Sequence, residues 1–231
     1  MTYGQVSKAT FLSRPNRFTA LVRLGGAQAA AHVKNTGRCA ELLVPGAPVY
    51  LAKAENPARK TGWDLVAVEK GGLLINMDSA APNKAAGEWL AAGGLGPLEQ
   101  LRAEYRLGDS RFDFYARRAG RELLVEVKGC TLETDGVAAF PDAPTLRGLK
   151  HVRELTALAR QGYDCRLLVV IQMKGPWLFR PNWATQPTFG RALAQARAAG
   201  VGLLAMDCRV TPAGMALDAP VPIDLAAPKG V

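Results

Sequence analysis

The chain has 231 residues, 48% of them hydrophobic and 21% charged, which is enough to bury a sizeable core and excludes a disordered protein. Its formal net charge of +9 favours polyanionic partners, although a basic soluble enzyme without such a partner would carry the same charge. Four cysteines without a C-x-x-C pair argue against a zinc site, and the lack of a signal peptide or a long apolar run predicts a cytoplasmic protein with no membrane partner.

Short alternating segments separated by turn residues predict an all-β N-terminal part over residues 1–82. The candidate strands are 10–12, 18–24, 29–33, 49–51, 63–68 and 73–75. So many short strands in some eighty residues are typical of a small barrel, and an OB-like barrel is the natural candidate. Strand spacing by itself does not separate this barrel from other small barrels.

Residues 83–231 follow a different pattern, in which helices alternate with strands. We predict helices over 83–91, 146–159 and 189–199, and strands over 99–107, 111–117, 122–127, 166–171 and 201–206. Asn83 is the candidate N-cap of the first helix, segment 133–144 is predicted to be a loop, and the last dozen residues a tail. The order α-β-β-β-α-β-α-β describes an α/β domain, a mixed sheet flanked by helices.

Three charged residues on the strands of this second domain carry the candidate chemistry. Glu126 and Lys128 point to one face because side chains alternate along a strand, and a hairpin can bring Asp113 beside them. Two adjacent carboxylates repel each other, and a Mg²⁺ or Mn²⁺ ion would relieve that repulsion while bridging to a phosphate. The set is suited to phosphodiester hydrolysis, with Lys128 orienting water or stabilising charge.

A third carboxylate, Glu88, could reach the same metal from the preceding helix. Each residue also has a plainer interpretation: Glu88 as a solvated helix residue, Asp113 as a hairpin-end aspartate, and Glu126 with Lys128 as an exposed ion pair. The order of helix, three strands and helix around these charges favours the metal site.

Basic residues in both domains are candidates for nucleic-acid contact. In the barrel they surround the Asn35-Thr36-Gly37 turn, and in the second domain they lie near the start of helix 146–159. The candidates are Arg14, Arg17, Lys34, Asn35, Arg38, Arg147, Lys150 and His151. Phe11, Phe18 and Tyr50 are available to stack on bases, although aromatics on short strands are more often core. The alternative for the helix residues is a solvated polar face.

Several segments resemble the sugar fermentation stimulation protein (SfsA) family. They are 32–38 (HVKNTGR), 110–114 (SRFDF), 125–132 (VEVKGCTL) and 140–155 (FPDAPTLRGLKHVREL). The resemblance implies an OB-like domain followed by a PD-(D/E)xK nuclease-like domain, DNA binding without strong sequence preference, and a link to the regulation of sugar use. It assigns Asp113 and Glu88 as metal carboxylates and Glu126 with Lys128 as the E-x-K pair. Phe112 stands where the superfamily pattern has proline.

Three functions remain open from the sequence. The first is a Mg²⁺-dependent nuclease acting on DNA, with RNA also open as a substrate. The second is a DNA-binding regulator that retains the nuclease fold without catalysis, and the third is a metal-dependent enzyme with a closed pocket for a small phosphorylated or nucleotide substrate. The sequence also leaves the oligomeric state open, a homodimer included.

Overall fold

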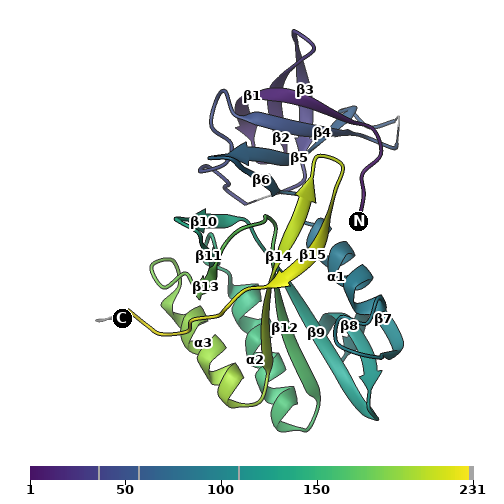
Figure 1. Cartoon of the computed structure of the whole chain (residues 1–231), viewed down its shortest axis with the longest axis vertical. Helices are drawn as coiled ribbons and strands as arrows, with labels where there is room; N and C mark the ends of the chain where they lie inside the picture. Colours follow the sequence, from purple (N-terminus) through teal and green to yellow (C-terminus); the bar gives the residue numbers. More distant parts are fainter. Residues whose placement is uncertain (36, 57, 109, 229–231) are drawn as a thin grey trace.

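The computed structural model describes residues 1–35, 37–56, 58–108 and 110–228. A β-barrel and an α/β domain stand one above the other. In the second domain, the hairpin of β14 (Gly202–Thr211) and β15 (Gly214–Pro220) reaches toward the barrel (Figure 1). Thr36, part of a predicted turn, and residues 229–231 of the predicted tail lie outside the described residues.

Six strands form the N-terminal sheet: β1 (Val6–Asn16), β2 (Thr19–Leu24), β3 (Ala27–Val33), β4 (Pro48–Lys53), β5 (Trp63–Lys70) and β6 (Leu73–Asn76). Their order is β3-β2-β1-β4-β5-β6, and a parallel pairing of β3 with β5 closes the sheet into a barrel. Alternate residues such as Phe11, Val22 and Leu65 point inward and are almost wholly buried. The predicted OB-like barrel is confirmed.

The second domain is built on a six-stranded mixed sheet in the order β15-β14-β12-β9-β8-β7. The strands are β7 (Glu99–Leu107), β8 (Ser110–Arg118), β9 (Arg121–Cys130), β12 (Asp164–Ile171), β14 (Gly202–Thr211) and β15 (Gly214–Pro220). Helix α1 (Ala81–Ala91) covers one face, and α2 (Leu146–Arg160) and α3 (Pro187–Ala198) cover the other (Figure 1). Strand β12 runs parallel to both β9 and β14, which confirms the predicted mixed sheet.

Some elements differ from the prediction. The expected loop 133–144 holds two short strands, β10 (Leu132–Thr134) and β11 (Val137–Phe140), which join β13 (Leu178–Pro181) in a small separate sheet. These strands are too short to display a period, and β11 pairs with a segment distant in sequence. The first helix begins at Ala81 because Pro82 suits a first helical turn, so Asn83 lies inside the helix and is not its cap.

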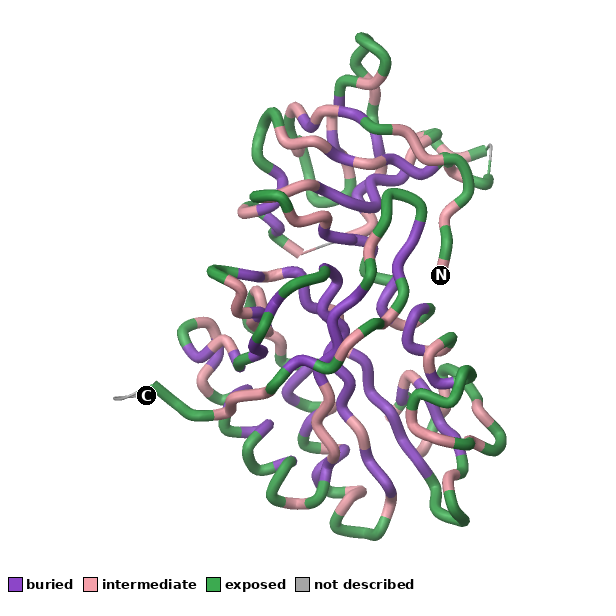
Figure 2. The backbone as a smooth tube through the Cα atoms, in the orientation of Figure 1, coloured by how far each residue is buried: buried purple, intermediate pink, exposed green. Residues whose placement is uncertain are grey.

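The two domains are joined by hydrogen bonds and by a shared apolar core. Gln172, directly after β12, donates through Nε2 to the backbone oxygen of Asn76 at 2.9 Å, and the Lys70 Nζ donates to the backbone oxygen of Glu133 at 2.7 Å. One cluster of buried side chains continues from Phe11 in the barrel to Leu149 on α2. Buried backbone follows β9 and β12 up to this junction (Figure 2). The barrel therefore lies over the C-terminal ends of β9 and β12.

Within the described residues, every helix is too short or too polar to cross a membrane.

Candidate metal centre and nucleic-acid interface

The candidate site forms where β8 and β9 separate. Their ladder ends at the pair Phe114–Val125, immediately before Asp113 and Glu126 would face each other. Beyond that pair the Asp113 side chain enters the gap, and its Oδ2 accepts a hydrogen bond from the backbone N–H of Val127 at 2.7 Å. A carboxylate thus takes the place of a strand carbonyl, which brings it beside the E-x-K segment of β9.

Asp113 is held by a second contact and lies in a shielded environment. Its Oδ1 accepts a hydrogen bond from Asn83 Nδ2 on α1 at 2.7 Å. Burial raises the pKa of the Asp113 carboxyl and the charge of Glu126 raises it further, against the opposing effects of Val127, Asn83 and Lys128. The raised pKa therefore comes mainly from burial, with a second contribution from the neighbouring carboxylate of Glu126.

Glu126 is 2% exposed, and its carboxylate bonds the described residues through one oxygen. Its Oε1 accepts a hydrogen bond from Lys128 Nζ at 2.5 Å and also contacts His151 Nδ1 on α2. Burial opposes ionisation, but the contacts with His151 and Lys128 outweigh it and hold the pKa of Glu126 below its ordinary value. Its Oε2 is buried and has no hydrogen-bond partner among the described residues.

The structure therefore brings Asp113, Glu126 and Lys128 together, as the sequence predicted, while their catalytic roles stay a prediction. Across the described ranges, the side chains form no cluster of three or more His, Cys, Asp or Glu that could hold a metal. The protein oxygens available to an ion are those of two carboxylates. That number is typical of Mg²⁺ sites, in which waters and substrate phosphate complete the shell.

The structure does not bring Glu88, the predicted third carboxylate, into contact with the other two. Its side chain is 61% exposed and pairs with the amino group of Met1 at 2.5 Å. Helix α1 turns toward the sheet the face that carries Ala85, Ala86 and Leu90. Glu88 lies about 140° around the helix from Asn83, so the side chain that reaches the site is Asn83.

Three of the predicted nucleic-acid contacts are occupied by internal bonds. Arg14 donates to four backbone oxygens, those of Arg17, Asn35, Gly37 and Arg38, at 2.7–2.8 Å. Lys34 pairs with the buried carboxylate of Asp78 at 2.7 Å, and Asn35 Oδ1 accepts from the Gly37 N–H at 2.8 Å. Arg14 thus supports the fold of the loop, and a purely nucleic-acid-binding role for it does not fit its surroundings.

The remaining predicted contacts divide between surface and site. Arg17, Arg38, Arg147 and Lys150 are exposed, although Lys150 also lies 3.5 Å from Glu154. His151 faces inward and contacts Glu126, so it belongs to the carboxylate site and not to the surface.

Of the aromatics predicted to stack, Phe18 is 44% exposed, with Arg17 over its ring, whereas Phe11 is core. Tyr50 donates its hydroxyl hydrogen to Glu69 at 2.5 Å.

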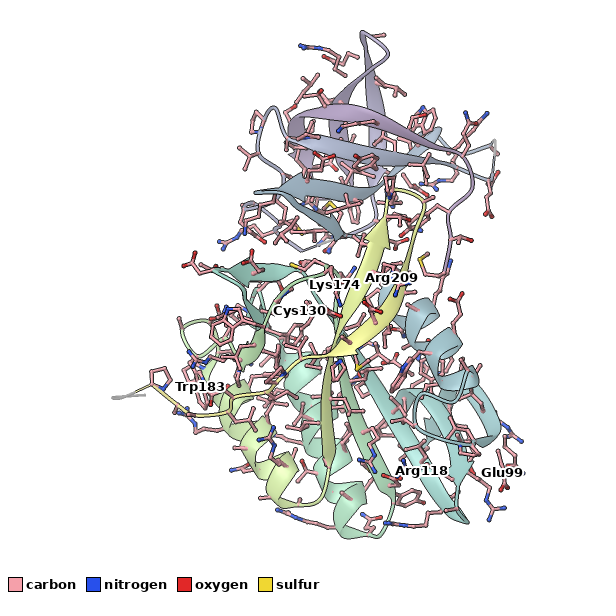
Figure 3. All side chains as sticks on the ribbon, viewed as in Figure 1. Glu99, Arg118, Cys130, Lys174, Trp183 and Arg209 are labelled. Atoms are coloured by element: carbon pink, nitrogen blue, oxygen red, sulfur yellow. The ribbon has the colours of Figure 1, made fainter. Side chains whose placement is uncertain are left out.

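The sequence analysis missed two residues. Asn83 contacts the carboxylate of Asp113, and Gln172 lines a cavity at the junction of the two domains. Asn83 was interpreted only as a helix cap, and Gln172 follows a buried strand whose C-terminal end adjoins β9. A polar residue directly after a parallel strand is a signal that could have found Gln172, since ligands gather at that edge of such sheets. Cys130, labelled in Figure 3, is paired with Ile171 and marks the same end of β9.

Comparison with known families and structures agrees with this two-part organisation. Residues 12–77 match the model of the SfsA N-terminal OB domain, and residues 80–214 match that of the sugar fermentation stimulation protein RE domain. The structure is similar to that of Pyrococcus furiosus SfsA in complex with Ca²⁺, with a TM-score of 0.87, 27% identity, and coverage of 97% of this chain and 98% of that chain.

Among curated relatives, a sugar fermentation stimulation protein homolog of Desulfitobacterium hafniense is 50% identical over 211 residues, covering 91% of this chain and 92% of its own length. The homolog of Alkaliphilus oremlandii is 45% identical over 235 residues, covering 98% and 100% of the two chains. The chain belongs to the sugar fermentation stimulation protein family.

Proposed function

We propose that this protein binds DNA and hydrolyses phosphodiester bonds with the help of a divalent cation, Mg²⁺ or Mn²⁺, held by Asp113 and Glu126. The observation that carries the proposal is the buried Glu126 Oε2, which has no partner among the described residues. A buried carboxylate oxygen left unpaired is costly unless it binds a proton, a donor or a metal. The lowered pKa of Glu126 disfavours the proton, which leaves a donor or a cation.

The donor set fits such an ion. Both carboxylates are mainly buried, and hydrogen bonds from Asn83, Val127 and Lys128 fix their orientation. Hard oxygen ligands favour Mg²⁺ or Mn²⁺ over softer metals. The solved Pyrococcus furiosus relative is described in complex with Ca²⁺, another cation that prefers oxygen ligands, and this supports the proposal. When bound, a divalent ion would supply an activated water and charge neutralisation at a phosphate.

The side chains around the ion have separate tasks in this proposal. Lys128 is held against Glu126 with 14% of its side chain exposed, so its ammonium can donate to a phosphate oxygen or to the attacking water. His151 positions Glu126 from the opposite side. Asn83 keeps Asp113 in the gap between the strands.

The exposed arginines support a nucleic-acid substrate. Gly37 and Thr145 line one cavity between the domains. Arg38 directly follows Gly37 in the sequence, and Arg147 lies two residues after Thr145. Exposed positive charge thus lies close in sequence to residues that line this cavity in both domains, and it would attract a phosphate backbone. A net charge of +9 is consistent with this partner.

A cleavage assay tests the proposal. Purified protein is incubated with labelled single- and double-stranded DNA and RNA in Mg²⁺, in Mn²⁺ and in EDTA. We expect cleavage in the metal-containing reactions, abolished by Asp113→Asn and by Lys128→Met, and retained by the matched variant Glu88→Gln, which changes an exposed carboxylate paired with the amino group of Met1. Cleavage that persists in both inactivating variants would contradict the proposal, because it would come from elsewhere.

A further inference from the structure

A cavity of about 280 Å³ lies between the barrel and the α/β domain. Both domains line it: Asn35 and Gly37 come from the barrel, Gly129 from the end of β9, Phe140 from the end of β11, Asp142 from the segment after β11, and Thr145 from the start of α2. Its volume is at the small end of the range for ligand pockets, about 300–1,000 Å³. It can hold one flat ring system but not a duplex.

The cavity adjoins the candidate metal centre. Gly129 directly follows Lys128, and Thr145 caps the helix that carries His151 by accepting the Gly148 N–H at 2.9 Å. The cavity also lies at the C-terminal ends of β9 and β12, the edge at which parallel sheets bind ligands. A base in this cavity and a phosphate at Asp113 and Glu126 could therefore belong to the same strand.

The walls of the cavity are held in place. Gln172 is 2% exposed, and its Nε2 donates to the backbone oxygens of Asn76 and Asp78. Its Oε1 packs closely against Gly129, because a Cβ added at Gly129 would lie only 2.5 Å from this oxygen. Across the cavity, Asp142 Oδ2 stands 3.1 Å from the position of a Cβ on Gly37, so the barrel and the second domain meet closely there. The cavity is therefore part of a fixed junction.

The chemistry of the lining favours a neutral occupant over a phosphate. The described lining residues include the carboxylate of Asp142 and no lysine or arginine. Asp142 and Gln172 offer oxygen acceptors, and Leu132 and Phe140 offer apolar surface. A neutral, flat group with N–H donors on its edge suits such a lining, and nucleobases have that character.

We propose that this cavity binds one unpaired nucleobase of the strand whose phosphate lies at Asp113 and Glu126. The proposal rests on the proposed function and adds the state of the substrate: a base taken out of its stack. Single strands, frayed ends and mismatches bind more readily than a perfect duplex, because a paired base has to be unstacked before it enters. The arginines outside the cavity bind the backbone, while the cavity itself binds the base.

Binding in EDTA tests the cavity without requiring cleavage. The affinity of the full chain is measured by fluorescence anisotropy for a short single-stranded DNA and for an abasic strand of equal length and phosphate count. We expect the strand with bases to bind about tenfold more tightly. A free deoxynucleoside monophosphate serves as competitor, and we expect it to displace the strand only at far higher concentration. Displacement at equal nucleotide concentration would identify a small nucleotide as the ligand and overturn the proposal.

Two variants locate the base contact. Ala143→Leu fills the cavity from an exposed position on its rim, and Asp142→Asn removes the charge while keeping the shape. Both should bring the ratio of the two affinities close to one, and Ala143→Leu, which changes no charge, should leave the affinity for the abasic strand unchanged. The matched controls Ala194→Leu, exposed on α3, and Asp135→Asn, exposed between β10 and β11, should keep the wild-type ratio.

Thermal unfolding checks that each variant is folded, and either cavity variant by itself suffices for the test. A wild-type ratio near one, or a ratio preserved in the folded cavity variants, would overturn the proposal. The second result would move the base contact elsewhere, for example to Phe18 on the barrel. Neither result depends on metal-dependent cleavage, so failure of the cavity and failure of the proposed function can be told apart.

Discussion

Asp113 Oδ2 accepts the backbone N–H of Val127 at 2.7 Å, a bond that a carbonyl of the neighbouring strand would otherwise make. The ladder between β8 and β9 stops at Phe114 and Val125 for this reason, and the gap holds a carboxylate in place of backbone. The same bond fixes Asp113 next to Glu126. A structural irregularity in the sheet therefore creates the acidic site.

Replacing Asp113 with asparagine should remove one source of pH dependence from the stability of the metal-free protein. Burial and the charge of Glu126 raise the pKa of Asp113, so the folded state disfavours its ionised form. The stability that this carboxyl contributes is complete below its unfolded pKa, about 3.9, and declines as pH rises through the higher folded pKa. Thermal unfolding in EDTA should therefore show the melting temperature of Asp113→Asn, relative to that of the wild type, rising between pH 3.5 and pH 7.

The same variant should lose the increase in melting temperature that Mn²⁺ gives the wild type, because a ligand that binds only the folded state stabilises it. A relative melting temperature that stays constant or falls between pH 3.5 and pH 7 would contradict the direction assigned to the pKa of Asp113.

Asn83 and Glu88, on the same helix, should differ sharply in their effect on activity. Asn83→Ala removes the bond to Asp113 Oδ1, and loss of such a supporting contact typically costs about 10–100-fold in metal affinity or activity. Glu88→Gln alters an exposed residue outside the site and should leave both unchanged. Metal titration and cleavage rates measured side by side decide the matter. Equal losses in the two variants would restore Glu88 to the site.

Arg14 should matter to stability more than to DNA binding. Its guanidinium makes hydrogen bonds to four backbone oxygens of the loop around Gly37, and Arg14→Ala should lower the free energy of unfolding by about 2–4 kcal/mol. Arg38→Ala, at an exposed position, should change stability by less than about 0.5 kcal/mol. It should instead reduce the slope of DNA affinity against salt by about 1. Denaturant unfolding and salt titrations separate the two outcomes, and a stable Arg14→Ala protein with a reduced salt slope would reverse these roles.

The glycine after the E-x-K segment should not tolerate a methyl group. A Cβ at Gly129 would lie 2.5 Å from Gln172 Oε1 and 2.7 Å from Pro82 Cγ. Overpacking of this kind costs about 1–3 kcal/mol, so Gly129→Ala should unfold at lower denaturant concentration than the wild type. Gly62→Ala, where the added Cβ would meet nothing within 4 Å, is the matched control. Equal stabilities of the two variants would indicate that the junction adapts easily.

Much of the fold could be predicted from the sequence because its elements have clear periods. Strand β12 is a continuous apolar run, and α2 carries Leu149, Val152 and Leu155 on one stripe. The alternation of Glu126, Val127 and Lys128 predicted correctly which two side chains share a face. Strands β10, β11 and β13 could not be found in this way, because they have three or four residues each and are defined by their pairing.

The site was predictable where alternation along a strand decides the face of a side chain. It was not predictable where the outcome depends on which face of a helix packs on the sheet. Glu88 seemed suited to the metal from its helix, but the face that α1 buries depends on the small residues Ala85 and Ala86 packing on the sheet. The inward orientation of His151 depends likewise on how α2 lies across β9. The sequence does not indicate that Arg14 binds the backbone of Asn35 and Gly37, because only folding brings these segments together.

Isothermal titration calorimetry with Mn²⁺ tests the central claim most directly, because it asks whether Asp113 and Glu126 share one divalent cation. We predict one Mn²⁺ bound per chain in the wild type and no measurable binding in either Asp113→Asn or Glu126→Gln, with Glu88→Gln binding as the wild type does. Stoichiometric Mn²⁺ binding that survives in both variants would contradict the account.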